Sequence, residues 1–156
     1  LFINDGNGQF ADIVPIIGGA LSKPIVGRGA AYADYDKNGT LDIMVTENGG
    51  PVHLFRNDSN VHNFLRVNVK SISSTRDGLS TKLIGITKNN RMQRRVKTGS
   101  SFMSHSETTI TFGLGNDDVL DSLYVYWPNG SMEIFHNIYS GQEINITEGE
   151  GNWVVQ

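Results

Sequence analysis

The stretch Asn63-Phe64-Leu65-Arg66-Val67-Asn68-Val69-Lys70 alternates apolar and polar side chains from Leu65 onward. Successive side chains of a β-strand point to opposite faces, so one face of this segment is apolar and the other is polar. The same alternation recurs over residues 120–127, with Trp127 on the apolar face. Both segments therefore predict strands that bury one face in a core.

Short runs rich in Val, Ile, Leu, Thr, Phe and Tyr fill the rest of the chain, separated by Gly, Asn, Asp and Ser. This punctuation predicts an all-β fold with turns between short strands, because a long helical period is never sustained. Residues 61–150 are expected to form an antiparallel sandwich of seven or eight strands. The expected strands are 28–34, 41–46, 52–56, 63–72, 81–88, 92–98, 108–113, 120–127, 131–136 and 143–148.

Composition narrows the class of protein. The chain has 156 residues, of which 38% are hydrophobic, enough for a core but below the usual globular share. A net charge of -3 argues against a general nucleic-acid binder. No apolar run reaches the roughly 18 residues of a membrane span. The absence of cysteine excludes disulfides, thiol catalysis and a Cys-ligated zinc site.

A weak internal repeat divides the sequence. Leu1-Phe2-Ile3-Asn4-Asp5 returns as Leu54-Phe55-Arg56-Asn57-Asp58, a spacing of about 50 residues that fits the blade of a β-propeller. The residues after Asn60 do not continue the pattern of the repeat. We therefore expect a blade-like piece over residues 1–60, a β-sandwich module over 61–150 and a tail over 151–156.

The stretch Asp34-Tyr35-Asp36-Lys37-Asn38-Gly39-Thr40-Leu41-Asp42 is the strongest candidate site. Oxygen-bearing side chains alternate along it, and Gly39 permits a sharp reversal. Such a loop can turn several oxygens onto a hard cation such as Ca²⁺. The expected ligands are the carboxylates of Asp34, Asp36 and Asp42, the amide oxygen of Asn38 and the carbonyl of Thr40.

Two other interpretations of this loop were compared with the calcium site. An EF-hand is excluded, because the twelfth position is Val45 where that loop needs a bidentate Glu. A solvated Asp/Asn/Gly turn without a metal remains the alternative.

Residues 27–43, which contain this loop, resemble an FG-GAP (VCBS-type) repeat, and residues 1–12 resemble the end of a preceding one. Residues 63–148 resemble an ASPIC/UnbV domain, as in the cartilage acidic protein family. The pieces that carry this second resemblance are 63–67, 76–78, 99–102, 112–115, 127–130 and 137–138. The resemblances imply propeller blades with a Ca²⁺ loop, in secreted or surface proteins used in adhesion or binding, with no catalytic residues to carry over.

Two departures from these families matter. Ser80-Thr81 stands where the ASPIC/UnbV pattern usually has Gly-Ala. A propeller also needs several blades, and about one and a half are present. We therefore expect either the C-terminal end of a longer protein or copies that associate as homo-oligomers through unpaired strand edges.

Other chemistry receives weaker support. Ser104 and His105 are neighbours, which places them on opposite faces of a strand and disfavours a catalytic pair. The basic cluster consists of Arg91, Arg94, Arg95 and Lys97, with Arg94 expected on the opposite face from the others. A solvated sheet face explains it, and an acidic polysaccharide is the functional alternative.

These observations favour a calcium-stabilised, non-enzymatic module that binds a protein or glycan ligand at an extracellular, cell-surface or periplasmic location. One alternative is a carbohydrate-binding module that uses Tyr124, Tyr126 and the Arg/Lys face. Another is an accessory domain of a larger enzyme.

Overall fold

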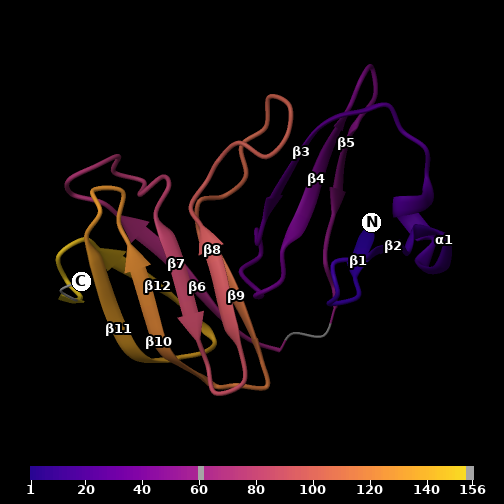
Figure 1. Cartoon of the computed structure of the whole chain (residues 1–156). Helices are drawn as coiled ribbons and strands as arrows, with labels where there is room; N and C mark the ends of the chain where they lie inside the picture. The colour runs from indigo at the N-terminus through magenta and orange to yellow at the C-terminus, as the bar shows by residue number, and fades with distance from the viewer. Residues whose placement is uncertain (60–61, 154–156) are drawn as a thin grey trace.

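The computed structural model describes residues 1–59 and 62–153, and strands dominate it. All ten expected strands are present, and the all-β prediction is confirmed (Figure 1). They are β3 (Gly27–Ala33), β4 (Asp42–Glu47), β5 (Val52–Phe55), β6 (Asn63–Lys70), β7 (Lys82–Ile86), β8 (Arg91–Arg95), β9 (Ile110–Gly115), β10 (Val119–Tyr126), β11 (Met132–Tyr139) and β12 (Gln142–Thr147).

Five short elements lie outside these ten strands. They are β1 (Phe2–Asn4), β2 (Phe10–Asp12), α1 (Val14–Ile17), the 3₁₀ turn η1 (Gly19–Ser22) and β13 (Asn152–Trp153). Pro15 sits in the first turn of α1, where a helix does not need its missing N–H. Strand β13 pairs with β11, so residues 152–153 join a sheet. Residues 60–61 lie outside the described residues, and the boundary near residue 60 stays a prediction.

The C-terminal strands form a sandwich of two sheets. One sheet has the order β13-β11-β10-β7-β8 and the other the order β12-β6-β9. The side chains predicted to face inward from the two alternating segments, such as Leu65 and Leu123, are completely buried. Trp127 is also buried, while Tyr124 and Tyr126 on the opposite face are partly exposed, as predicted. The core is therefore the space between the two sheets.

One strand pair departs from the antiparallel pattern. β12 runs parallel to β6, with Gln142 opposite Leu65 and Thr147 opposite Lys70. The chain leaves β11 in the larger sheet, turns at Gly141 with a φ of 74°, and enters the smaller sheet beside β6. This crossing between sheets fixes the direction of β12, and no local sequence signal encodes it.

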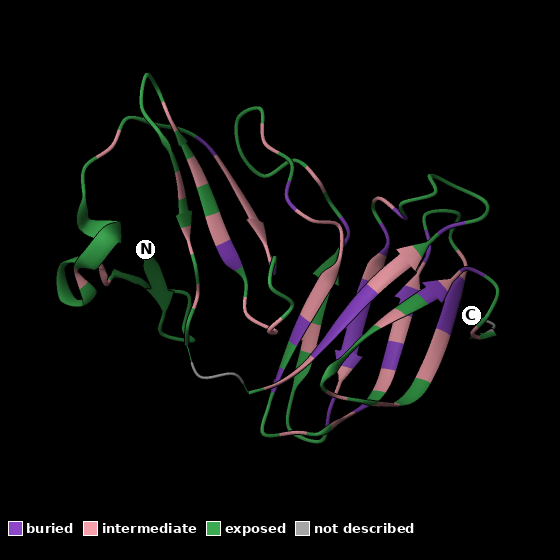
Figure 2. Ribbon diagram, turned by 180° about the vertical axis from the view of Figure 1, so that it is seen from behind, coloured by how far each residue is buried: buried purple, intermediate pink, exposed green. Residues whose placement is uncertain are grey.

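The N-terminal strands form two separate sheets. β3, β4 and β5 make an antiparallel sheet that stands beside the sandwich, and β1 and β2 make a hairpin (Figure 1). Burial is concentrated in the sandwich, whereas β1 and β2 are exposed throughout (Figure 2). Phe2, Phe10 and Leu54 are among the large apolar side chains that this part leaves exposed. Residues 1–59 therefore contribute little core of their own.

The long connection between β8 and β9 joins the two parts. Ser101 Oγ accepts a hydrogen bond from Ala30 N at 3.1 Å, and Ser106 Oγ accepts one from Tyr32 N at 3.2 Å. Glu107 N in turn donates to Tyr32 O at 3.1 Å. Residues 101–107 thus cover the edge of β3 that no strand pairs with in the described structure, which protects it from edge-to-edge association.

Candidate metal centre

The candidate cation loop joins β3 to β4. Carboxylate oxygens of Asp34, Asp36 and Asp42 lie within 4.8 Å of one another. Asp34 directly follows β3 and Asp42 begins β4, so the hairpin itself brings the first and last carboxylates together. Both are 2% exposed, while Asp36 faces solvent. The structure therefore assembles the three acidic members of the predicted ligand set.

Hydrogen bonds to backbone N–H groups shape this loop. The Asp34 carboxylate accepts from Asn38 N and from Gly39 N, both at 2.9 Å. The Asp42 carboxylate accepts from Tyr35 N at 3.2 Å and from Asn57 N at 2.8 Å. The loop is thus folded around its two buried carboxylates.

Gly39 is required where the loop meets the sandwich. Its φ is 91°, a region that L-residues with a side chain rarely adopt. A Cβ at this position would lie 2.2 Å from Cδ1 of Phe64 on β6. The glycine therefore serves both the reversal predicted from the sequence and a close approach that the sequence did not reveal.

The two remaining predicted ligands are placed differently. The amide oxygen of Asn38 accepts from Thr40 N at 2.8 Å and from Thr40 Oγ1 at 2.6 Å. The Asn38 amide nitrogen donates to Asp36 Oδ2 at 3.2 Å. A ligand role for the Asn38 oxygen would require the amide to rotate and give up its bonds to Thr40. Thr40 Oγ1 also lies 2.8 Å from Asn57 O, the second acceptor within reach of its single hydroxyl proton, which places the loop beside the end of β5.

The donor set fits a hard divalent cation. Carboxylate oxygens are the ligands that Ca²⁺ prefers, and carboxylates held this close repel one another without positive charge. Within residues 1–59 and 62–153, Asp36 and Asp42 form no ion pair with a basic side chain. Asp34, Asp36 and Asp42, with the Thr40 carbonyl, are the groups that would hold the cation and neutralise this charge.

Arg66 of β6 connects the loop to the sandwich. Its Nη1 donates to Asp34 Oδ2 at 2.8 Å, its Nη2 to Glu107 Oε2 at 3.0 Å and its Nε to Glu143 Oε2 at 2.9 Å. The side chain is only 4% exposed. Arg66, Asp34, Glu107 and Glu143 are called the arginine clamp below. In this clamp, Arg66 binds one carboxylate from the cation loop, one from the β8–β9 connection and one from β12.

The clamp shifts the pKa of two of its members, Arg66 and Glu143. Burial lowers the pKa of Arg66, but hydrogen bonds to Glu107 and Glu143 outweigh it and raise the pKa above its usual value. The hydrogen bond from Arg66 lowers the pKa of Glu143. Arg66 and Glu143 therefore both carry their charge at neutral pH. Sequence reasoning placed Arg66 on the polar face of its strand but missed the clamp.

The buried carboxylate of Glu148 is satisfied by hydrogen bonds within the sandwich. Glu148 is 6% exposed and accepts from Ser71 Oγ and Ser73 Oγ, both at 2.6 Å, and from Ile72 N and Ser73 N. Burial raises the pKa of Glu148, but these hydrogen bonds outweigh that effect and lower it to about 2. Every contact is internal, so Glu148 closes a loop and offers no open ligand position.

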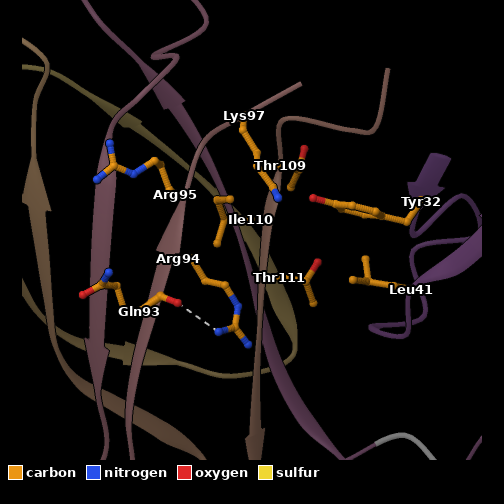
Figure 3. Close-up of a pocket in the computed structure, with 9 residues that line it drawn as sticks. All are labelled: Tyr32, Leu41, Gln93, Arg94, Arg95, Lys97, Thr109, Ile110 and Thr111. Carbon is orange, nitrogen blue, oxygen red and sulfur yellow. Dashed lines mark hydrogen bonds between the residues drawn. The ribbon is translucent and has the colours of Figure 1, made fainter. Parts of the chain in front are cut away.

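The basic cluster is divided differently from the prediction. β8 ends at Arg95, so the strand alternation does not extend to Lys97. Arg94, Arg95 and Lys97 all line one groove. The side chains of Arg94 and Lys97 extend toward Thr111 and Tyr32, whereas that of Arg95 extends in the other direction (Figure 3). Arg91 lies on the outer face with Tyr124 and Tyr126. The prediction that Arg94 faces away from Lys97 was wrong.

Ser104 and His105 form no hydrogen bond with each other in the described structure. Ser104 Oγ instead donates to Phe102 O at 2.9 Å. The geometry therefore gives no nucleophile–base pair at this position.

The helical segments in residues 1–59 and 62–153 are single short turns, and none of them could span a lipid bilayer.

Comparison with known proteins identifies relatives of this chain. The family model described as ASPIC and UnbV matches residues 71–152. Cartilage acidic protein 1 of Homo sapiens is 30% identical over 139 residues, covering 84% of this chain and 20% of that protein. Cartilage acidic protein 1 of Mus musculus is 32% identical over 123 residues, covering 74% of this chain and 18% of that protein. The chain thus spans about one fifth of the length of these relatives.

Proposed function

The chain belongs to the ASPIC and UnbV family, and from this premise we propose that it is a calcium-stabilised, non-enzymatic binding module of an extracellular, cell-surface or periplasmic protein. Its ligand would be a protein or a glycan. Calcium is assigned a structural role, because the loop that would hold it connects two strands and contacts the sandwich. The observation that carries the proposal is the carboxylate cluster of Asp34, Asp36 and Asp42.

The N-terminal part is proposed to be an FG-GAP-like propeller blade. Its three antiparallel strands carry the acidic loop between the first two, β3 and β4. That arrangement is what the FG-GAP resemblance implies for a blade. The exposed apolar side chains of residues 1–54 suit packing against further blades or a second copy.

The cation should stabilise the folded chain through mass action. At free Ca²⁺ about 100 times the dissociation constant, the free energy of unfolding should rise by about 2.7 kcal/mol. For a chain of this size the melting temperature should rise by roughly 5 to 11 °C. Mg²⁺ should do less, since it retains its waters and resists cages made of protein oxygens.

Thermal unfolding in Ca²⁺, Mg²⁺ and EDTA tests this proposal. The wild type should be stabilised specifically by Ca²⁺, and Asp36→Ala should abolish that effect. Asp58→Ala is the matched control, because Asp58 is an exposed carboxylate of the same part that pairs with Arg56. It should keep the Ca²⁺ response. An undiminished response in Asp36→Ala would refute the site.

A further inference from the structure

A groove lies between the sandwich and the N-terminal sheet. It has a volume of about 460 Å³ and is lined on one side by Arg94 and Lys97 and on the other by Tyr32 (Figure 3). Thr109, which directly precedes β9, and Thr111 within β9 also line it. The groove therefore opens where the two edge strands β8 and β9 of the sandwich meet the outlying sheet, the kind of junction at which ligand sites often occur.

The groove carries positive charge that nothing nearby neutralises. Within the described structure, Arg94 and Lys97 have no carboxylate within 4 Å. Residues 78–106 include six Lys or Arg residues and no Asp or Glu, in a chain whose net charge is -3. The adjacent carboxylate of Glu107 is already bound by Arg66. The groove is thus a local cationic site on an acidic protein.

Hydroxyl groups complement these cations. The Thr109 hydroxyl donates to Asn68 Oδ1, so its remaining lone pairs can accept a hydrogen bond. Thr111 Oγ1 accepts from Arg66 Nη1 at 3.4 Å, which leaves its own proton available to donate. The Tyr32 hydroxyl points toward Lys97 and Thr109 (Figure 3). Leu41 adds an apolar wall beside the Tyr32 ring.

We propose that this groove binds an acidic sugar unit, with its carboxylate or sulfate on Arg94 and Lys97 and its hydroxyls on Tyr32, Thr109 and Thr111. This inference rests on the proposed binding function, but it does not depend on a cation in the loop. A sugar ring has an apolar face as well as hydroxyls, which suits the walls formed by Tyr32 and Leu41. The volume falls in the range of small-molecule sites.

The same features disfavour other anions. An inorganic anion would engage the two cations and leave the hydroxyls and the apolar wall without a role. A nucleic acid would need a longer basic track, and the acidic chain as a whole would repel its backbone. The outer face of the larger sheet, where Arg91 lies beside Tyr124 and Tyr126, is the competing location on this protein for a charged glycan.

NMR titration of the full chain tests the groove with four probes. These are glucuronate, a heparin-derived tetrasaccharide, neutral maltotetraose and inorganic sulfate. We expect the amides of Thr109 and Thr111 to shift with glucuronate and with the tetrasaccharide, and not with maltotetraose. Binding of glucuronate identifies a free sugar acid as sufficient, whereas binding of the tetrasaccharide alone identifies the polymer as the source of the unit.

Matched variants locate the site. Arg94→Ala and Lys97→Ala should each weaken binding at least about tenfold, since each removes a charge-assisted hydrogen bond. Arg91→Ala removes the same charge from the opposite face of the same strand and should change affinity less than about twofold. Unfolding curves of the three variants should match that of the wild type, because all three side chains are exposed.

Several outcomes would overturn the proposal. Binding that is lost in Arg91→Ala or Tyr124→Ala but kept in Lys97→Ala would place the sugar on the outer face. Sulfate that binds as tightly as glucuronate would reduce the groove to an anion site. If no acidic probe shifted these amides, the proposal that the groove binds an acidic ligand would be refuted. All titrations are repeated in EDTA, so that a failed groove and a failed cation loop give separate results.

Discussion

Replacement of Arg66 by methionine tests how the N-terminal part is held to the sandwich. Methionine keeps an unbranched chain of similar reach and removes only the charge and its donors. Three carboxylates would lose a partner, and one of them, Asp34, has a side chain with 0% exposure. Breaking a buried ion pair by removing one partner typically costs about 3 to 5 kcal/mol, because the remaining charge stays buried and unpaired.

For a chain of this length that loss corresponds to a fall in melting temperature of roughly 6 to 20 °C. The assay is urea and thermal unfolding of Arg66→Met in EDTA, followed by circular dichroism. Ca²⁺ should recover part of the loss, because it would supply positive charge to Asp34 from the other side. The Ca²⁺-dependent rise should therefore be larger in the variant than in the wild type.

Lys37→Met is the matched control for Arg66→Met. Lys37 also pairs with Glu143, at 3.6 Å, but its side chain is 68% exposed. An exposed pair of this kind is worth less than about 1 kcal/mol, so this variant should unfold almost as the wild type does. A loss below about 1 kcal/mol in Arg66→Met would show that the clamp is not a stabilising junction and would refute the reasoning.

Two further predictions concern the sandwich. The pKa of Glu148 lies at about 2 in the folded chain, below its ordinary value of 4.5, so its carboxylate contributes stability above about pH 4.5 that is lost as the pH falls toward 2. The loss should be about 1 to 3 kcal/mol, the lower value allowing for solvent screening. The measurement is the free energy of unfolding from pH 6 to pH 2. The loss should be absent in Glu148→Gln and retained in the exposed control Glu150→Gln. Ser80 has a φ of 75°, where a side chain is strained, so Ser80→Gly should raise the free energy of unfolding by about 0.5 to 1 kcal/mol. Ser74→Gly, at a position without positive φ, should not be stabilised, and the same result for both variants would contradict the explanation.

The strands were predictable because burial imposes a period of two on the sequence. Leu65 and Val67 on β6 face the core, and Leu123 and Val125 on β10 face it from the other sheet. Each segment carries this signal in itself, whichever strands it pairs with. The departure from the family pattern at Ser80-Thr81 is also explained by local structure. Ser80 occupies a backbone region that glycine favours, which accounts for the glycine usual in the family at this turn.

The partners of each strand were not predictable in this way. The parallel pair of β6 and β12 depends on where the chain crosses between sheets, and the register of Arg66 against Glu143 follows from that crossing. Arg66 alternates correctly as a polar-face residue, yet it is 3% exposed because the cation loop covers that face. A single sequence shows an arginine on a strand, but it does not show which of 16 acidic residues will meet it.

The cation loop has a buried half, whose carboxylates are held by hydrogen bonds, and a solvent-facing half, whose side chains are held less firmly. Asp34 and Asp42 are buried and already hold backbone N–H groups, so their positions are fixed before any ion arrives. Asp36 is exposed, and its described hydrogen bond is with the Asn38 amide, which must turn away to offer its oxygen. The ordering cost of binding therefore falls on Asp36 and Asn38, since the buried half of the loop is preorganised by these backbone hydrogen bonds and by the turn at Gly39. Affinity should accordingly be limited by the solvent-facing half, even though the buried half carries the contacts to the sandwich.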